Sequence, residues 1–372
     1  MCKLGELIES FDSERIPIDS SLRISGQYPY YGATGIIDYI DSYIFDGEYV
    51  LLAEDGANII MRNYPVAYLT QGKFWLNNHA HIMRMVKGDN QFLVQILEKM
   101  NYSKYNTGTA QPKLNSNIVK RINLRVPIPE EQQKIGTLFK QLDDTITLHQ
   151  RKLDQLKELK TAYLQVIFPV KDERVPKLRF ADFEEEWELC KLGDLANIVG
   201  GGTPNTNNPK CWDGNIDWYA PAEIKEKIYV TGSKKRITEL GLQKSSAKVL
   251  PIGTVLFTSR AGIGNTAILA KKGTTNQGFQ SIIPNKNKLD TYFIFSRTHE
   301  LKKYGEAVGA GSTFVEVSGK QMAKMPMLTP RFNEQQAIGM FFKKIDDIIT
   351  LHQNKLEQLK DLKTSYLQNM FI

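Results

Sequence analysis

Amide, hydroxyl and basic side chains gather in glycine-containing stretches that follow apolar runs of the sequence. These stretches are EDGAN (54–58), LNNHAH (76–81), TSRAGIGN (258–265) and TNQGFQ (275–280), and GQYPYYGATGI (26–36) adds paired aromatic rings. An Asn or Gln amide can form two hydrogen bonds with adenine, and an Arg guanidinium can do the same with guanine. Lys and Arg side chains can hold phosphates and fix the register of a reader on nucleic acid. Together the loops suit base reading, although a structural turn explains any single one.

We therefore take the polar, aromatic and basic side chains of these and neighbouring loops as candidate DNA-binding residues. In the first half of the chain they are Tyr30, Tyr31, Asn58, Asn77, Asn78, His79 and Lys113. In the second half they are Thr203, Asn205, Lys210, Ser259, Arg260, Asn265, Asn276, Gln277, Ser312 and Thr313.

Motifs that assemble a catalytic site are missing from the sequence. There is no GxSxG, no dinucleotide fingerprint, no (N/D)PP(Y/F) stretch and no His/Cys spacing typical of a metal site. GGGTPNT (200–206) lacks the GK[ST] of a P-loop, so we interpret it as a turn, with a phosphate contact as the alternative. Glu223-Ile224-Lys225, after Asp213 or Asp217, is similar to nuclease acid pairs, but so short a match often arises by chance. We predict a binding protein with no catalytic residue, metal site or cofactor of its own.

Composition limits the classes of protein that the chain can belong to. Its 372 residues suggest two to three domains, and 41% hydrophobic residues suffice for real cores. The net charge is +7, and about +6 of it lies outside the two repeated segments described next, which suits a polyanion although many soluble proteins are as basic. Three cysteines and the lack of a long apolar run indicate a reduced, cytoplasmic protein with no membrane partner.

Residues 131–168 and 334–371 are two copies of one segment, identical at 26 of 38 aligned positions. Neither copy contains Pro, and Leu, Lys, Gln and Glu dominate both. Pro129 and Pro330 precede the copies, and Pro169 follows the first. Each copy therefore predicts one helix about 57 Å long.

The apolar positions of each copy recur in alternating steps of four and three, which is typical of a coiled-coil seam. The predicted seam is Ile135, Phe139, Leu142, Ile146, His149, Leu153 and Leu156, and in the second copy Ile338, Phe342, Ile345, Ile349, His352, Leu356 and Leu359. We interpret the two histidines as buried polar groups that set the register. We expect the helices to pack antiparallel on each other with a pseudo-two-fold relation; the alternative is that each packs on another protein.

The segments outside the repeats share a faint skeleton. CKLGEL resembles CKLGDL, YVLLAEDGAN resembles TVLFTSRAGIGN, NNHAHIM resembles NQGFQSII, and NTGTAQPKLN aligns with GAGSTFVEVS. Short β-branched runs and Gly/Asn/Pro turns predict mixed domains, so the fold class is α+β. We predict recognition-type domains at 1–128 and 170–328, with a linker at 170–189, and helical spacers at 129–169 and 329–372.

This pattern resembles the specificity subunit of type I restriction–modification enzymes over essentially the whole chain. The resemblance rests on GQYPYYGATGI, LLAEDGAN, WELCKLGDL, GGGTPNT with WDGNIDWYAPAEI, TNQGF, and the duplicated PEEQQKIGTLFKQLDDTI followed by LHQ..KL.QLK.LK..YLQ. The lead VPKLRFADFEEEW has no counterpart ahead of Cys2, whereas the family often has one, so a truncated start and a misannotated start are the two interpretations.

The resemblance implies two target-recognition domains, each reading one half of an asymmetric, bipartite site on double-stranded DNA. It implies that the helices set the gap and that the chain binds two methyltransferase subunits, with restriction subunits in the full complex. S-adenosylmethionine, ATP and Mg would then be used by the partners. Two alternatives remain open, namely a nuclease or methyltransferase with a degenerate site, and a coiled-coil scaffold without a DNA role.

Overall fold

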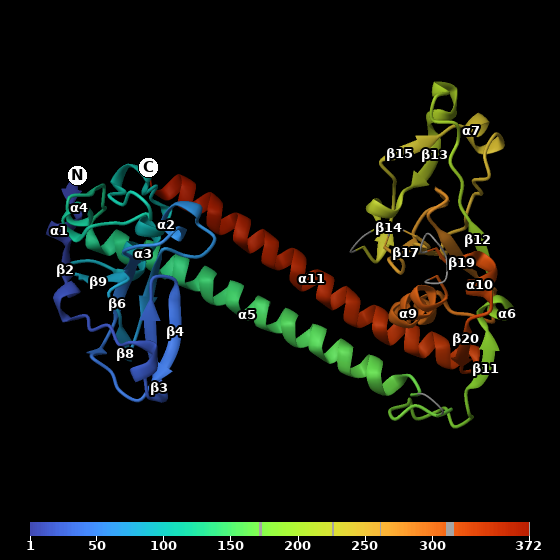
Figure 1. Cartoon of the computed structure of the whole chain (residues 1–372), viewed down its shortest axis with the longest axis horizontal. Coiled ribbons are helices and arrows are strands. Elements are labelled where there is room, and N and C mark those ends of the chain that lie inside the picture. The colour runs from blue at the N-terminus through green and yellow to red at the C-terminus, as the bar shows by residue number, and fades with distance from the viewer. Residues whose placement is uncertain (171–172, 225–226, 261, 310–315, 372) are drawn as a thin grey trace. The chain divides into compact units, whose positions relative to one another are not determined.

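The computed structural model describes residues 1–170, 173–224, 227–260, 262–309 and 316–371. The chain divides into two compact units. Unit 1 comprises Met1–Lys152 and His352–Ile372, and unit 2 comprises Leu153–Leu351 (Figure 1). Each unit therefore contains one globular segment and a part of each repeated segment.

The described residues of unit 1 form two four-stranded sheets and one two-stranded sheet. The first sheet is antiparallel, in the order β2 (Ile8–Ser10), β9 (Ala80–Met85), β6 (Tyr49–Ala53), β7 (Ala67–Thr70). The second has the order β4 (Gly35–Ile40), β3 (Ser25–Gly32), β8 (Lys73–Leu76), β5 (Phe45–Asp46), with β3 and β8 parallel. Strands β1 (Cys2–Lys3) and β10 (Asn123–Leu124) pair, and the short helices are α1 (Leu4–Leu7), α2 (Asn58–Met61), α3 (Asn90–Lys99), α4 (Ser116–Lys120), η1 (Asp12–Glu14), η2 (Ser20–Leu22) and η3 (Ser103–Tyr105).

The described residues of unit 2 repeat this plan with changes. The larger sheet has the order β12 (Ala196–Gly200), β19 (Gln280–Pro284), β16 (Val255–Phe257), β17 (Thr266–Leu269), β14 (Tyr229–Val230). The smaller sheet is β15 (Lys235–Ile237), β13 (Trp212–Tyr219), β18 (Thr274–Thr275), with β13 and β18 parallel, and β11 (Glu188–Lys191) pairs with β20 (Pro326–Thr329). The short helices are α6 (Leu192–Leu195), α7 (Glu239–Gln243), α8 (Thr291–Ser296), α9 (Thr298–Gly309), α10 (Gly319–Ala323), η4 (Pro209–Cys211) and η5 (Pro221–Glu223).

Apolar sequence runs place the central strands. All five residues of β6 are buried, as a strand covered on both faces requires. Helix α3 begins at its cap Asp89, whose carboxylate accepts a hydrogen bond from the backbone N–H of Phe92 at 2.7 Å. The apolar side chains of α3 then pack between the sheet and the long helices of unit 1. The α+β class is therefore confirmed for both globular segments.

The repeated segments form two long helices, α5 (Pro129–Ile167) and α11 (Phe332–Met370), of 39 residues each. In unit 1, Asp143 on α5 pairs with Lys363 on α11 at 2.6 Å. In unit 2, Lys160 on α5 pairs with Asp346 on α11 at 2.6 Å. Rising numbers on α5 meet falling numbers on α11, so the predicted antiparallel packing is confirmed in each unit. No helix of the described chain is long and apolar enough to cross a membrane.

The repeat extends to individual contacts. Phe139 packs against Phe371 in unit 1, with ring centroids 5.8 Å apart. The equivalent Phe342 packs against Phe168 in unit 2 at 5.9 Å. The ion pairs named above are related by the same offset of 203 residues. One arrangement of helix contacts is therefore built twice, as an internal repeat predicts.

The predicted seam is buried at most of its positions, but not at the histidines. Ile146, Leu156, His149 and His352 are half-buried, and the other seam residues are buried. Nδ1 of His149 lies 2.8 Å from Nδ1 of His352, so one ring must donate its hydrogen to the other. Partial burial and the neighbouring His352 charge lower the pKa of His149. The expectation of a fully buried pair is wrong, because both rings reach the edge of the helix interface.

The single glycine of each copy marks where a globular segment meets its long helix. A Cβ at Gly136 would lie 1.9 Å from Oδ1 of Asp89, the cap of α3. At Gly339 it would lie 2.3 Å from Oδ1 of Asp290, the cap of α8. Any larger residue would push the short helix off the long one, which explains a glycine inside a helical sequence.

Candidate nucleic-acid interface

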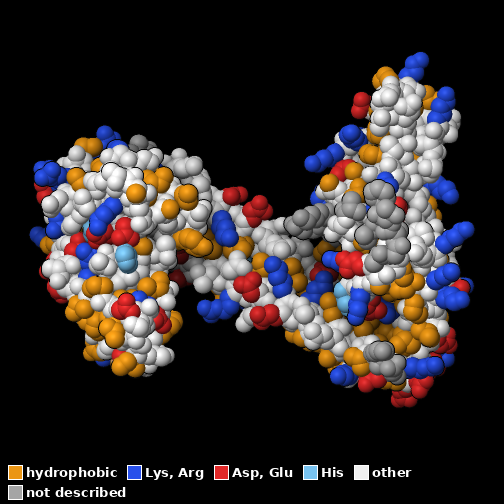
Figure 2. All heavy atoms as spheres, in the orientation of Figure 1, with side chains coloured by type: hydrophobic (Ala, Val, Ile, Leu, Met, Phe, Trp, Pro, Cys, Tyr) orange, Lys and Arg blue, Asp and Glu red, His pale blue; other side chains and the backbone are white. Residues whose placement is uncertain are grey.

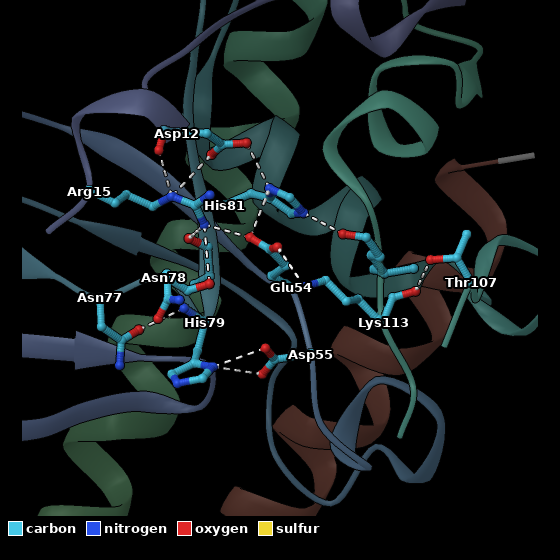
Figure 3. A network of polar contacts seen from close by, with 12 residues as sticks. Asp12, Arg15, Glu54, Asp55, Asn77, Asn78, His79, His81, Thr107 and Lys113 are labelled. Atoms are coloured by element: carbon cyan, nitrogen blue, oxygen red, sulfur yellow. Dashed lines mark hydrogen bonds and ion pairs between the residues drawn. The ribbon is translucent and has the colours of Figure 1, made fainter. Parts of the chain in front are cut away.

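Three loops of unit 1 meet beside the ends of β6 and β8. Asp55, just after β6, forms a β-bridge with Lys113. The turn after β8 is closed by Asn77, whose side-chain oxygen accepts a hydrogen bond from the backbone N–H of His79 at 2.8 Å. Figure 3 shows these residues converging with side chains from the N-terminal loop. The sequence motifs EDGAN and LNNHAH are therefore brought together.

A charged network lies beneath these loops (Figure 3). The Asp12 carboxylate accepts hydrogen bonds from Nδ1 of His81 at 2.8 Å and from the backbone N–H of Ile82 at 2.9 Å. Nε2 of His81 lies 2.7 Å from the carbonyl oxygen of Leu114. Both ring nitrogens of His81 therefore face an oxygen acceptor, and these contacts hold the ring between the N-terminal loop and Leu114.

Electrostatics stabilise the network in its charged form. Burial alone would raise the pKa of Asp12, but the hydrogen bond and charge of His81, the Ile82 N–H and Arg15 together lower it to about 2. Nη1 of Arg15 also pairs with the Glu54 carboxylate at 2.6 Å. The loops are therefore tied to the sheet through ionic hydrogen bonds, which are stronger than neutral ones.

Two side chains project from this network to the surface. Nδ1 of His79 lies 2.9 Å from the Asp55 carboxylate, and Nζ of Lys113 lies 3.4 Å from that of Glu54. The side chains of His79 and Lys113 are 52% and 46% exposed. Each is an outward donor held by a carboxylate beneath it, which suits contact with a polyanion.

Unit 2 builds the same turn from different residues. The backbone N–H of Asn276 donates to the carbonyl of Tyr219 at 3.0 Å, as that of Asn77 does to Tyr31 at 3.1 Å. The side chain of Asn276 accepts from the N–H of Gly278 at 2.8 Å, which is the same closure of the turn. The alignment of NNHAHIM with NQGFQSII is therefore structurally correct.

The glycine-rich stretch of unit 2 passes close to this turn. A Cβ at Gly201 would lie 2.0 Å from the carbonyl oxygen of Asn276, and one at Gly202 would lie 2.3 Å from Oγ of Ser246. The close approach brings the hydroxyl of Thr203 into a hydrogen bond with the side chain of Gln277. GGGTPNT therefore begins at the end of β12 and continues as a loop whose backbone lies close to its neighbours, and a phosphate contact there stays a prediction.

Several predicted contact residues hold the loops instead of facing outward. Tyr30 and Ser259 are 0% exposed, and Asn77 is buried. The side-chain amide of Asn58 bonds the backbone of Tyr64 in both directions, with its oxygen accepting at 2.8 Å and its nitrogen donating at 3.0 Å. The prediction that Tyr30, Ser259 and Asn77 contact DNA directly is corrected, because the fold encloses their side chains. Ser312 and Thr313 lie outside the described residues.

The remaining candidates reach the surface of their units. Asn78, His79, Lys113, Asn205, Lys210 and Gln277 are exposed, and Tyr31, Asn58, Thr203, Arg260, Asn265 and Asn276 are half-buried. Whether they touch DNA stays a prediction.

The antiparallel pair β13–β15 of unit 2 and the hairpin β3–β4 of unit 1 carry different surfaces, which were not predicted from the sequence. In unit 2, Lys234, Lys235 and Arg236 are exposed beside β13, where Figure 2 shows Lys and Arg side chains. In unit 1, Ile36, Ile37 and Tyr39 of β4 are exposed, in the region where Figure 2 shows hydrophobic side chains. The run GSKKRI was the available signal for the basic surface beside β13.

The acids that are similar to a nuclease pair are engaged in turns. The Glu223 carboxylate accepts from the backbone N–H groups of Ala220 at 3.0 Å and of Lys234 at 2.5 Å. Asp217 accepts from Ser233 and lies 3.4 Å from Arg236. Within the described part of the chain, no group of three or more His, Cys, Asp or Glu could hold a metal ion. These contacts give both acids a structural role.

Comparison with known proteins identifies the class. The chain matches the type I restriction modification DNA specificity domain twice, over residues 1–158 and 184–361, and it belongs to this family. The resemblance found in the sequence is thereby confirmed.

Individual relatives agree with that assignment. The chain is 27% identical over 347 residues to a putative type I restriction enzyme specificity subunit of Haemophilus influenzae, covering 93% of this chain and 87% of that protein. It is 33% identical to the MjaIX specificity subunit of Methanocaldococcus jannaschii over 50% of this chain, but spans only 44% of that relative. A crystal structure of the type I S subunit from M. genitalium has the same fold, with a TM-score of 0.71, 13% identity, and coverage of 100% of this chain and 95% of that one.

Proposed function

We propose that this chain is a non-catalytic, cytoplasmic specificity subunit whose two recognition domains each read one half of an asymmetric bipartite site on double-stranded DNA. The recognition domains are residues 1–128 and 170–328. The observation that carries the proposal is the turn built twice, with the same backbone hydrogen bonds and different exposed side chains. A shared scaffold with different reading groups is what two unlike half-sites require.

The helix pair would fix the distance between the half-sites. Each helix has 39 residues, and their antiparallel contacts repeat in both units. A hydrophobic seam of this kind resists bending and slipping, because every shift exposes buried side chains. We propose that residues 129–169 and 329–372 set the gap.

The outer faces of the helices would bind two methyltransferase subunits. Leu148 and its repeat equivalent Leu351 are exposed, as are Leu159 and its equivalent Leu362. Leu148 and Leu159 lie about three helical turns apart, so they share one face of α5, and Leu351 and Leu362 share the equivalent face of α11. The same set occurs twice, which suits two copies of one partner. Restriction subunits would join the full complex, and S-adenosylmethionine, ATP and Mg would be used by the partners.

A segment exchange tests the proposal. Residues 1–128 are replaced by the corresponding segment of another family member, and methylated adenines are mapped in a host that carries the chain with its partners. One half of the methylated sequence changes and the other half stays. A change in both halves would refute separate readers.

The two alternatives predict different results in simpler assays. A degenerate nuclease or methyltransferase would act on DNA without partners, whereas this chain alone has no activity. A scaffold without a DNA role would bind DNA weakly and without steep salt dependence, whereas phosphate contacts make affinity fall steeply with salt. The structural roles of Glu223 and Asp217 favour the non-catalytic reading.

A further inference from the structure

One position on the recognition loops carries opposite charges in the two units. Asp55 forms a β-bridge with Lys113, and Arg260 forms the equivalent bridge with Glu316. The equivalence is fixed by the backbone, since Leu114 donates to the Glu54 carbonyl at 2.7 Å and Val317 donates to that of Ser259 at 3.0 Å. Residues opposite each other in such a bridge point to the same face. An acid and a base therefore share this face in both units, with their positions exchanged.

The neighbouring turn has changed together with this position. In unit 1 the turn carries His79, and its Nδ1 lies 2.9 Å from the Asp55 carboxylate. In unit 2 the equivalent residue is Gly278, where a Cβ would lie only 3.0 Å from Oδ1 of Asn276. At this face, unit 1 therefore presents the imidazole of His79 bound to the Asp55 carboxylate. Unit 2 has a glycine in place of the histidine and presents the guanidinium of Arg260.

The environment leaves Arg260 available. Its side chain is half-buried, and among the described residues no acceptor bonds its guanidinium. By contrast, Arg15, Arg179 and Arg297 each bond a carboxylate. A guanidinium held near the surface with unused donors suits a ligand with two adjacent acceptors.

We infer that Arg260 is a base-reading residue of the second recognition domain and contacts guanine through N7 and O6. The pair Asp55 and His79 occupies the same reading position in the first domain. This inference rests on the proposed function. An arginine fork pairs with the two guanine acceptors in the major groove, whereas an imidazole held by a carboxylate presents a single ring nitrogen. The two half-sites therefore differ at the equivalent base pair.

Selection from a randomised duplex DNA library tests this with the full chain assembled with its methyltransferase subunits. The variants are Arg260→Ala and Arg260→Lys, with His79→Ala as the matched change in the first domain. Arg260→Lys keeps the positive charge but loses the two-pronged geometry. Both Arg260 variants relax one guanine in one half-site, with discrimination there falling about 10- to 100-fold. His79→Ala relaxes a position in the other half-site only.

The outcomes separate the inference from the proposed function. If the wild-type chain enriches no bipartite sequence, the proposed function fails, and the inference with it. A second outcome is that the wild-type chain enriches a bipartite sequence while both Arg260 variants lose affinity to the same extent for every sequence. In that case Arg260 holds a phosphate, and the inference is overturned. An unchanged sequence preference in Arg260→Lys also overturns it, and this variant decides the case should Arg260→Ala unfold, as thermal unfolding would reveal.

Discussion

Asp346 and Asp143 occupy equivalent positions in the repeat but differ in burial, so they form a matched pair of perturbations. The side chain of Asp346 is 5% exposed, and it accepts bonds from Nζ of Lys160 at 2.6 Å and from the hydroxyl of Tyr292 at 2.8 Å. The side chain of Asp143 is 39% exposed and pairs with Lys363 at 2.6 Å. Replacing each aspartate with alanine removes the same ion pair from two different environments.

The two losses should differ severalfold in free energy of unfolding. Asp346→Ala leaves the buried hydroxyl of Tyr292 and the largely buried ammonium of Lys160 without their acceptor. We expect a cost of about 3 kcal/mol, which is the lower end of the range for a broken buried pair, because Lys160 is partly exposed. The two lysines are similarly buried, but the Asp143 carboxylate is 39% exposed and makes only a long 3.4 Å contact with Gln95 besides the lysine, so Asp143→Ala should cost about 1 kcal/mol at most. For a unit of roughly 200 residues, about 3 kcal/mol lowers the Tm by roughly 6–12 °C, against less than about 4 °C for Asp143→Ala.

Scanning calorimetry and urea unfolding of the full chain measure both variants under identical conditions. A double-mutant cycle of Asp346 with Lys160 then separates the pair from the Tyr292 hydrogen bond. Equal shifts for the two alanine variants, or a larger shift for Asp143→Ala, would refute the reasoning that burial sets the cost of these ion pairs.

Three further results are expected. The pKa of Asp12 is about 2 in the folded state against an ordinary value of 3.8. Its contribution to the free energy of unfolding, about 2 kcal/mol, is therefore present above pH 4 and lost as the pH falls to 2. Urea unfolding of Asp12→Asn should lack this pH dependence. Burial and the nearby Asp346 raise the pKa of Tyr292, so this residue lowers the stability of the folded state as the pH rises above 10. Other buried tyrosines do the same, so Tyr292→Phe should reduce the alkaline loss in a pH-dependent thermal melt without abolishing it. Inserting seven residues at His149 and at His352 adds about 10 Å to each helix. The insertion should lengthen the recognised gap by about three base pairs or abolish methylation. An unchanged gap with full methylation would contradict the spacer role.

The long helices could be predicted because their signal is local and repeated. The 3.5-residue period of Phe139, Leu142 and their neighbours needs no knowledge of the rest of the fold. The duplication supplied the antiparallel partner, which a single copy would have left open. The half-exposed histidines were not predictable, since the pattern assigns a position to the seam but not its depth.

The sequence pointed to loops that the structure brings together, but it did not separate the exposed side chains from those that the fold encloses. Asn58, Asn77 and Tyr30 have the right chemistry for a base contact. The two asparagines instead close turns with their side-chain hydrogen bonds, and the ring of Tyr30 is buried with its hydroxyl bonded to the backbone of Ile18. Asn and Asp side chains bond nearby backbone readily, so residue type alone cannot separate a reader from a turn. The exchange of charge between Asp55 and Arg260 became visible only when backbone hydrogen bonds fixed the alignment.

The order of synthesis gives the repeated seam a further consequence. Helix α5 leaves the ribosome well before its partner, because residues 168–331 separate the two helices. At about 5–20 residues per second, the apolar face of α5 waits on the order of ten to thirty seconds for α11. Nascent chains on the same messenger present identical waiting faces during that interval. Closely spaced ribosomes on one messenger should therefore favour pairing between neighbouring chains, and infrequent initiation of translation should favour the monomer.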